Sequence, residues 1–526
     1  MYTTVQQKFE HDHFVFSIDG RMSALLIVIL LLIIAYKFYE FLSCIPPNAP
    51  PCIPRLPLGG SYWYLLWGDY KFPHKTVSYY VKKFQSKILS CYLGGFMAVI
   101  ANDYESIKEI LTREEFDGRA TDVDVVKARA FGKELGIFFT EGSFWKEQRR
   151  FALRHMRDFG FGRRHDKFES DMMEELNILV DMLKEGPIND YEKSYLKHGY
   201  ALFPDILYPY SANSIWDIMF GDRFNRSQHQ KLIYLCQAAM KFQRGGDTTG
   251  AALFQRWFLK YFGDMFGYKS IIDGSYRIAS FVMKHIEERK QLYDEDIGRG
   301  LIDRYLSELK KNSNVMSTFS EEQLIILLVD IMFPALSAAP SAIVHAIKLL
   351  MHNPNVLKNA QEEIDRVVGT GRHVTWEDRK NMPYTEAMIR EALRYETLTP
   401  FGVIHKTIKD TTLGGFNVPK DTLAITNLDE LNHDPDLWGD PENFRPERFL
   451  AEDGQLGKDF TFVFGLGHRV CAGETFARYN MFGVLAVLMQ NFHFSFVEGQ
   501  PTSLEDKLPG LITTPKETWI KVEPRY

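Results

Sequence analysis

The stretch Phe464-Gly465-Leu466-Gly467-His468-Arg469-Val470-Cys471-Ala472-Gly473 decides the fold of this chain. It holds one cysteine in a glycine-rich loop, and the apolar run from Phe476 to about Phe492 predicts a helix just after it. The glycines permit tight turns and the close approach of a flat ligand. Backbone N–H groups of such a loop, and the N-terminus of the next helix, stabilise a thiolate, which suits a metal ligand. A buried structural cysteine in a glycine-rich turn is the alternative.

The loop resembles the haem-binding signature of the cytochrome P450 family, Phe-x-x-Gly-x-Arg-x-Cys-x-Gly. All five fixed positions are filled, by Phe464, Gly467, Arg469, Cys471 and Gly473. The resemblance implies heme b, with Cys471 as the axial thiolate on its iron, an arrangement that favours O–O cleavage. It also implies the cytochrome P450 fold, which is mostly α with a small β lobe in a single large catalytic domain. Arg469 offers a planar fork of donors to a carboxylate nearby.

The composition is that of a folded globular protein, with 45% hydrophobic and 25% charged residues among 526. A net charge of −6 gives no reason to expect nucleic-acid binding. The five cysteines form neither a Cys-x-x-Cys pair nor a zinc spacing. This argues against a disulfide framework and favours a reducing compartment.

An uncharged apolar run, residues 22–36, is extended by aromatic residues to about residue 42, which is near the roughly 20 residues of a spanning helix. We predict a membrane anchor at 22–42, after a polar segment 1–21. A cleaved signal peptide is the alternative, although no small-residue cleavage site follows. Met22 is an alternative start.

Six prolines follow the anchor and predict a stiff hinge over residues 43–60, ahead of a catalytic domain at 61–526. This order resembles the P450s of the endoplasmic reticulum membrane, or microsomes, whose catalytic domain faces the cytosol. More lysines follow the anchor than precede it, which favours the same orientation.

A Trp-x-x-x-Arg pair, Trp145 and Arg149, lies at helical i, i+4 spacing and so on one helix face. In the family such a pair is expected to hold a haem propionate. His405 lies in a segment, 400–406, that resembles the strand approaching a propionate, so it is a further candidate for cofactor binding. The basic segment 150–164 is either a solvated face or part of a docking surface for an acidic electron donor.

A long helix is predicted from a Ser-x-x-Gln capping box at Ser320 to about Met351. In the family such a helix passes over the haem and carries an acid and a threonine that organise water for proton delivery. Here Ser337 stands in place of the acid and Ala338 in place of the threonine. Prolines at 334 and 340 predict a kink and a local opening of the helix.

Three readings of this departure stay open. Ser337, or a hydroxyl of the substrate, orders the water in an ordinary monooxygenase. Alternatively, the protein is a P450-type isomerase or dehydratase that acts on a hydroperoxide without a reductase. In the third reading it is a haem-bound carrier of lipophilic ligands.

Two further motifs agree with the family. Glu391 and Arg394 match its Glu-x-x-Arg, and Pro446-Glu447-Arg448-Phe449 matches its Pro-Glu-Arg-Phe. We predict a buried network of Glu391, Arg394 and Arg448 with a structural role.

The resemblance is greatest to microsomal, membrane-anchored P450s of arthropods. It implies a monooxygenase that inserts one oxygen atom from O2 into a lipophilic small molecule, such as a steroid, fatty acid, terpenoid or xenobiotic. The implied partners are NADPH-cytochrome P450 reductase, which supplies the electrons, and cytochrome b5.

Overall fold

The computed structural model describes residues 20–43, 45–57, 59–121, 123–245, 267–291, 298–311 and 317–526. The chain divides between Pro47 and Asn48 into two compact units, a short N-terminal one and a large one. The predicted polar segment 1–21 lies almost wholly outside the described residues.

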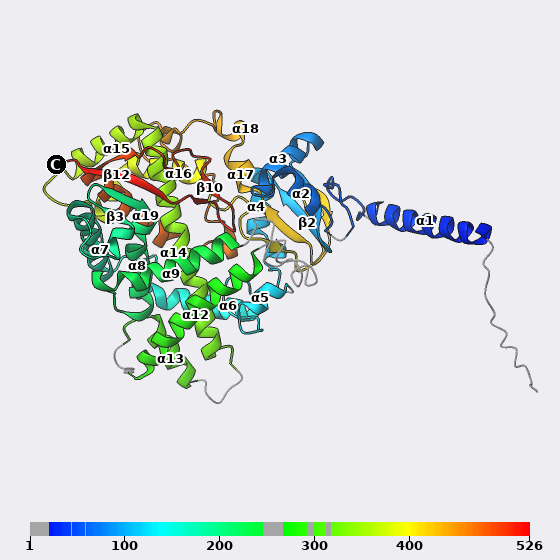
Figure 1. Cartoon of the computed structure of the whole chain (residues 1–526), viewed down its shortest axis with the longest axis horizontal. Helices are drawn as coiled ribbons and strands as arrows, with labels where there is room; N and C mark the ends of the chain where they lie inside the picture. Colours follow the sequence, from blue (N-terminus) through cyan, green and yellow to red (C-terminus); the bar gives the residue numbers. More distant parts are fainter. Residues whose placement is uncertain are drawn as a thin grey trace, which may run out of the picture. The chain divides into compact units, whose positions relative to one another are not determined.

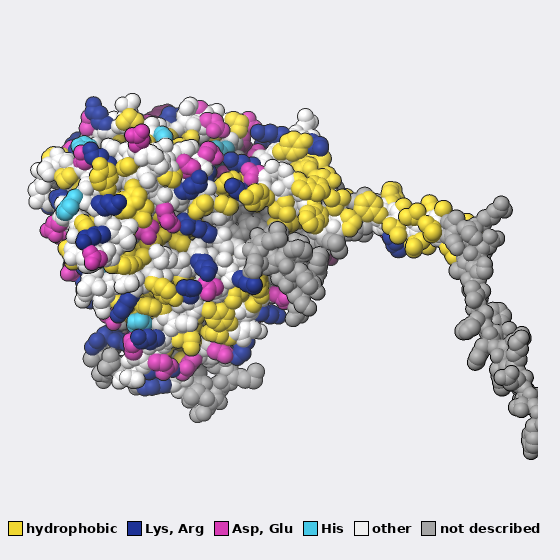
Figure 2. All heavy atoms as spheres, in the orientation of Figure 1, with side chains coloured by type: hydrophobic (Ala, Val, Ile, Leu, Met, Phe, Trp, Pro, Cys, Tyr) yellow, Lys and Arg dark blue, Asp and Glu magenta, His cyan; other side chains and the backbone are white. Residues whose placement is uncertain are grey.

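The described part of the N-terminal unit is one helix, α1 (Gly20–Ser43). Its apolar side chains from Leu25 to Ile34 are each between 43% and 64% exposed. Figure 2 shows these hydrophobic side chains along the helix, whereas the visible face of the large unit mixes cationic, anionic and apolar side chains. A helix that is apolar on all sides requires an apolar environment.

The large unit is mostly helical (Figure 1). In chain order its helices are α2 (Tyr62–Asp69), α3 (Pro73–Phe84), α4 (Tyr104–Thr112), α5 (Asp124–Ala128), α6 (Gly142–Arg157), α7 (Asp166–Glu185), α8 (Tyr208–Phe220), α9 (His229–Gly245), α12 (Tyr268–Gln291), α13 (Leu301–Lys311), α14 (Glu321–His352), α15 (Pro354–Val367), α16 (Pro383–Tyr395), α17 (Leu428–Asn432), α18 (Pro435–Trp438) and α19 (Glu474–Asn491).

The strands in the described part of the chain form small sheets. One sheet has the order β1-β2-β8-β5, built from β1 (Ile88–Leu93), β2 (Phe96–Ala101), β8 (Leu423–Thr426) and β5 (His405–Lys406). A second has the order β3-β4-β12-β9, built from β3 (Leu196–Lys197), β4 (Tyr200–Phe203), β12 (Thr518–Pro524) and β9 (Phe492–Phe496). Two hairpins pair β6 (Thr411–Leu413) with β7 (Phe416–Val418), and β10 (Lys507–Leu508) with β11 (Thr514–Pro515). The predicted fold class is confirmed.

Helix α14 runs through the centre of the large unit. It is long and apolar enough to cross a membrane, but two thirds of its apolar stretch is buried in the protein, so it is a core helix. The Ser320 hydroxyl caps it, accepting a 3.1 Å hydrogen bond from the Gln323 N–H. The other half of the predicted capping box is not formed, because Gln323 Oε1 instead accepts from the Gly136 N–H at 2.7 Å.

The two prolines of α14 do not break it. The helix is continuous across Pro334 and Pro340, from Glu321 to His352. Each proline removes one backbone N–H donor, so the carbonyls of Asp330 and Leu336 lose their usual partners four residues on. The prolines therefore do not interrupt the helix. Their effect is the loss of two backbone N–H donors.

Candidate functional site

The cysteine loop is held in a tight conformation by its own backbone. Gly465 and Gly467 have φ angles of +71° and +68°, which favour glycine. A Cβ at Gly467 would lie 2.3 Å from the carbonyl oxygen of Leu111 in α4, so only glycine fits this approach. The Cys471 N–H donates to the Phe464 carbonyl at 2.8 Å, and α19 begins three residues after the cysteine. The loop thus presents the Cys471 side chain at the N-terminus of a long helix.

The Cys471 thiol is open to a ligand. Its side chain is accessible to solvent, although enough protein surrounds it for burial to raise the pKa of the thiol. The backbone N–H of Gly473 and the charge of Arg149 act in the opposite direction and lower that pKa. Both favour the thiolate, the form that binds a metal.

Trp145 and Arg469 stack beside the loop. The Arg469 Cζ lies 3.6 Å from the centroid of the Trp145 ring. Arg469 donates to the Asp117 carbonyl through Nε and Nη2, at 2.9 and 2.7 Å, and to the Thr140 carbonyl through Nη1 at 3.0 Å. Trp145 is only 5% exposed, and its Nε1 finds no acceptor within the part of the chain that the structure describes.

Two more arginines surround this stack. Arg149 of α6 lies 5.7 Å from the Trp145 ring and donates through Nη2 to the Val470 carbonyl in the cysteine loop. Arg119 is 5% exposed and donates through Nη1 to the Ile404 carbonyl at 3.1 Å. Burial lowers the pKa of Arg119, and the positive charges of Arg469 and Arg149 lower it further. Arg119, Arg149 and Arg469 thus place three positive charges in one partly buried region, which favours the binding of an anion.

Arg119 is a residue that the motifs do not predict. It follows the dipeptide Asp117-Gly118, which forms β-bridges with Lys406, and no pattern of spacing connects it with Trp145 or with the cysteine loop. Its Nε has no partner among the described residues, although it is buried. A lone arginine after an Asp-Gly dipeptide is the available signal in the sequence, and it is a weak one.

His405, at the start of β5, is buried at 3% exposure beside these arginines. Its Nδ1 lies 2.8 Å from the Phe116 carbonyl oxygen. Burial holds the pKa of His405 well below its ordinary value, and the charge of Arg119 adds to this effect. His405 is therefore neutral at pH 7, and it is a hydrogen-bonding group rather than a fourth cation.

One face of α14 is apolar and partly open. Pro334, Ala335, Ala338 and Ala339 lie three or four residues apart on this face and are half-buried. Ser337 is not on it: this residue is fully buried, and its hydroxyl donates to the Phe333 carbonyl at 2.5 Å. In this structure the Ser337 hydroxyl is thus committed to the helix backbone, whereas Ala338 lies on the open face.

The comparisons with known proteins decide the family. The model for "Cytochrome P450" matches residues 50–522, nearly the whole chain. This chain belongs to the cytochrome P450 family. This P450 is 32% identical to rat cytochrome P450 2J3 over 88% of its own length and 89% of the relative. It is 29% identical to farnesoate epoxidase of Bombyx mori over 92% and 94%, and 31% identical to human cytochrome P450 2J2 over 89% and 90%.

Membership of this family makes the protein a monooxygenase with a thiolate-ligated haem iron. The residues described above fit such a group. Trp145 Nε1 and Arg119 Nε are buried donors with no acceptor among the residues that the structure describes, and haem carries two carboxylates. The Cys471 thiol is accessible near these donors. Arg149 connects the donors to the cysteine loop through its hydrogen bond to the Val470 carbonyl.

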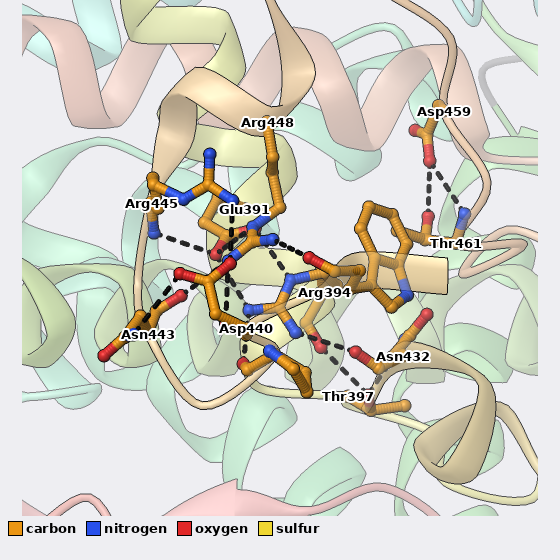
Figure 3. Close-up of polar contacts among 12 residues, drawn as sticks. Glu391, Arg394, Thr397, Asn432, Asp440, Asn443, Arg445, Arg448, Asp459 and Thr461 are labelled. Atoms are coloured by element: carbon orange, nitrogen blue, oxygen red, sulfur yellow. Dashed lines mark hydrogen bonds and ion pairs between the residues drawn. The ribbon is translucent and has the colours of Figure 1, made fainter. Parts of the chain in front are cut away.

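A buried network of ion pairs, shown in Figure 3, lies between α16 and the segment that precedes the cysteine loop. Arg394 donates to Glu391 through Nε and Nη2 at 2.7 and 2.8 Å, and both side chains are fully buried. Arg448 donates to the same carboxylate at 3.0 Å and to the carbonyls of Trp438, Asp440 and Asn443. The predicted network is confirmed. It joins α16 to the segment that leads into the cysteine loop.

Proposed function

We propose that Cys471 is the axial ligand of heme b in this P450. Phe464, Gly467 and Gly473 shape its loop, and the donors that hold the haem carboxylates are Trp145, Arg119, Arg149, Arg469 and His405. The observation that carries the proposal is an accessible thiol beside three arginines and a buried indole N–H that has no acceptor in the described part of the chain. Bound haem supplies the iron chemistry that activates O2. The chain's residues bind and orient the group, tune the thiolate and shape the space for a substrate.

The substrate that we propose is a lipophilic small molecule, of the steroid, fatty-acid, terpenoid or xenobiotic kind. The open face of α14 offers alanine and proline side chains, and Phe138 and Phe333 pack edge-to-face at 5.1 Å nearby. This lining gives a substrate apolar contacts rather than charged partners. The silkworm relative is named for an epoxidation of farnesoate, which is a lipophilic acid.

We propose NADPH-cytochrome P450 reductase as the electron donor, with cytochrome b5 as a second partner. Exposed arginines on α6 and just after it, Arg150, Arg154, Arg157 and Arg163, support a docking surface for an acidic protein. Helix α1, with its exposed apolar side chains, supports anchoring in the endoplasmic reticulum membrane at residues 22–42. In this proposal residues 43–60 are the hinge and residues 61–526 the catalytic domain, facing the cytosol.

A second candidate is the isomerisation or dehydration of a hydroperoxide. It is favoured by Ala338, which places a methyl group on the open face of α14 where a proton-relaying hydroxyl is expected. Such a reaction needs no reductase, because its substrate already contains the O–O bond. A ligand carrier with little turnover is the third candidate.

The test uses purified holoprotein with its reductase in lipid. NADPH consumption, hydrogen peroxide release and product formation are recorded over a panel of lipophilic compounds, beside a run with lipid hydroperoxides and no NADPH. Product that appears only with NADPH supports the monooxygenase reaction with a reductase partner. Product from hydroperoxides alone favours the second candidate, and ligand binding without product in either run favours the carrier.

A further inference from the structure

A second group of titratable side chains surrounds His345 of α14, outside the candidate haem site. His345 is 3% exposed, and its Nδ1 lies 3.8 Å from the Glu396 Oε2, just beyond the end of α16. Glu396 is 4% exposed and accepts a 3.0 Å hydrogen bond from the Nζ of Lys507 in β10. Three elements therefore place an imidazole, a carboxylate and an ammonium group in sequence inside the protein. We call these three residues the His345 relay.

One end of the His345 relay reaches solvent. The Lys507 side chain is 17% exposed, whereas the other two side chains are 4% exposed or less. The negative charges of Glu505 and Asp429 also raise the pKa of Lys507. Glu505 pairs at the surface with Lys75 at 3.5 Å, both side chains being largely exposed. Protons can thus reach Glu396 through groups that exchange with water.

The other end of the His345 relay is the Nε2 atom of the same ring. Among the described residues the Nε2 of His345 has no hydrogen-bond partner, although it is buried. His345 is seven residues from Ala338, so it lies on the same helix face, about 10.5 Å farther along the axis. Between them lies Ser341, which is fully buried and donates to the Ser337 carbonyl at 2.8 Å. A buried nitrogen without a protein partner is a usual position for an ordered water molecule.

Burial and the surrounding charges keep the His345 ring neutral. Burial lowers the pKa of His345, and the cations Lys507 and Lys348 lower it further, whereas Glu396 and the backbone of Thr513 raise it. These groups come from β10, from α14 itself and from the end of α16. Lys348 is occupied by a 2.7 Å hydrogen bond to the Ser503 carbonyl. A neutral imidazole can accept a proton on one nitrogen and release one from the other.

We propose that His345 and Glu396 carry protons from Lys507 and solvent to water on the Ala338 face of α14, in place of the expected acid–threonine pair. In each passage Glu396 takes one proton from the Lys507 ammonium and passes it through water across the 3.8 Å gap to the His345 Nδ1, while Nε2 releases one proton to water. Solvent then reprotonates Lys507. Insertion of one oxygen atom from O2, with the other leaving as water, consumes two protons and two electrons, and the reductase supplies the electrons. The proposal rests on the monooxygenase activity of the family. Because His345 acts through water, it is a positioning residue.

The experiment compares His345→Gln and Glu396→Gln with the parent holoprotein. With reductase and NADPH in air-saturated buffer, it records NADPH oxidation, the share of electrons released as hydrogen peroxide, the pH profile and the ratio of rates in H2O and D2O. Each variant should raise the peroxide share at least twofold, slow proton-dependent turnover about tenfold and flatten the pH profile near neutrality. A positioned general acid typically contributes a factor of about 10² to 10⁴. His352→Gln is the matched control, since this exposed histidine on the same helix bonds to the Thr502 carbonyl.

The spectrum of the reduced, carbon-monoxide-bound protein and its melting temperature report folding and haem retention independently of turnover. If His345→Gln does not fold, the same measurements are made on Glu396→Gln and Lys507→Met, which change the other two members of the relay. If the reductase does not reduce the parent protein, the proposed partner is wrong. The relay is then tested with dithionite-reduced protein mixed with oxygenated H2O or D2O buffer. If folded, haem-containing variants show the same peroxide share, isotope ratio and pH profile as the parent protein, the proposed proton relay is wrong.

Discussion

The Arg469 guanidinium stacks on the Trp145 indole at 3.6 Å, joining the cysteine loop to α6. This stack fixes the plane of the indole and leaves its buried N–H without an acceptor among the described residues. Arg119 and Arg149 add charge around it. The same stack therefore orients a neutral donor and supplies a cation, which is the combination that a carboxylate of a bound group needs.

Replacing Cys471 should abolish thiolate ligation. In Cys471→Ala we expect complete loss of the thiolate-type absorption band of the reduced, carbon-monoxide-bound protein. The reason is that no other described cysteine is accessible: Cys91 and Cys236 are buried and Cys52 is half-buried. Cys52→Ser is the control and should keep the band. A thiolate spectrum in Cys471→Ala would refute the ligand assignment.

Replacing Trp145 should weaken haem retention. Trp145→Phe keeps the stack with Arg469 but removes the unpartnered N–H. A hydrogen bond to a charged group contributes about 1.5–3 kcal/mol, so haem transfer to an excess of apomyoglobin should be roughly 10- to 100-fold faster. Trp63→Phe, whose indole bonds to the Pro57 carbonyl far along the chain, is the control. Equal transfer rates in both variants would show that Trp145 does not bind the haem.

The two candidate positions on α14 should respond differently to substitution. Ala338→Thr places a hydroxyl on the open face and should lower the share of NADPH electrons lost as hydrogen peroxide, by about twofold or more, given the typical effect of a positioned acid. Ser337→Ala should leave that share unchanged, because the hydroxyl is buried and bonded to Phe333. The measurement is peroxide released per NADPH oxidised. A raised share in Ser337→Ala would restore Ser337 as the residue that orders water.

Breaking the buried ion network should destabilise the protein strongly. Arg394→Met leaves the Glu391 carboxylate buried with Arg448 as its remaining cation. Removing one partner of a buried pair costs about 3–5 kcal/mol, so the melting temperature should fall by several degrees and haem should be lost with it. Lys358→Met breaks the exposed pair with Glu362 and should leave the melting temperature unchanged. Similar melting temperatures for the two variants would contradict a structural role of the network.

Stability should fall on acidification, and His229 should contribute to the fall. Burial lowers the pKa of His229 to about 4, against about 6.5 in the unfolded chain. Below about pH 6.5 the unfolded state therefore binds more protons than the folded state, and stability is lost as the pH falls toward 4. The slope contributed is at most about 1.4 kcal/mol per pH unit. His229→Gln should reduce the slope of unfolding free energy between pH 6.5 and 4.5.

The control for this slope is His493→Gln, at an exposed position of β9. It should follow the parent protein at each pH in the same urea titrations. If His229→Gln also follows the parent, the protonation of His229 does not differ between the folded and unfolded states.

Much of the candidate site could be predicted because its motifs are local. The cysteine loop, the Trp145–Arg149 pair and the Ser320 cap each lie within a few residues, and backbone geometry and hydrogen bonding determine such segments. The Glu391–Arg394 pair is local as well, and its third member, Arg448, belongs to a recognisable motif. The side-chain direction of Ser337 was not predictable, since it depends on how α14 is rotated within the core.

The sequence by itself determined the family, the long helix from Ser320 and the identity of the proposed thiolate, because contiguous residues carry those signals. Only the tertiary structure decided that Arg119 joins Arg149 and Arg469, and that His345, Glu396 and Lys507 meet. These groups come from separate elements with no common spacing. Their approach is set by how whole helices and hairpins pack, a property of the complete core that no short pattern of residues encodes.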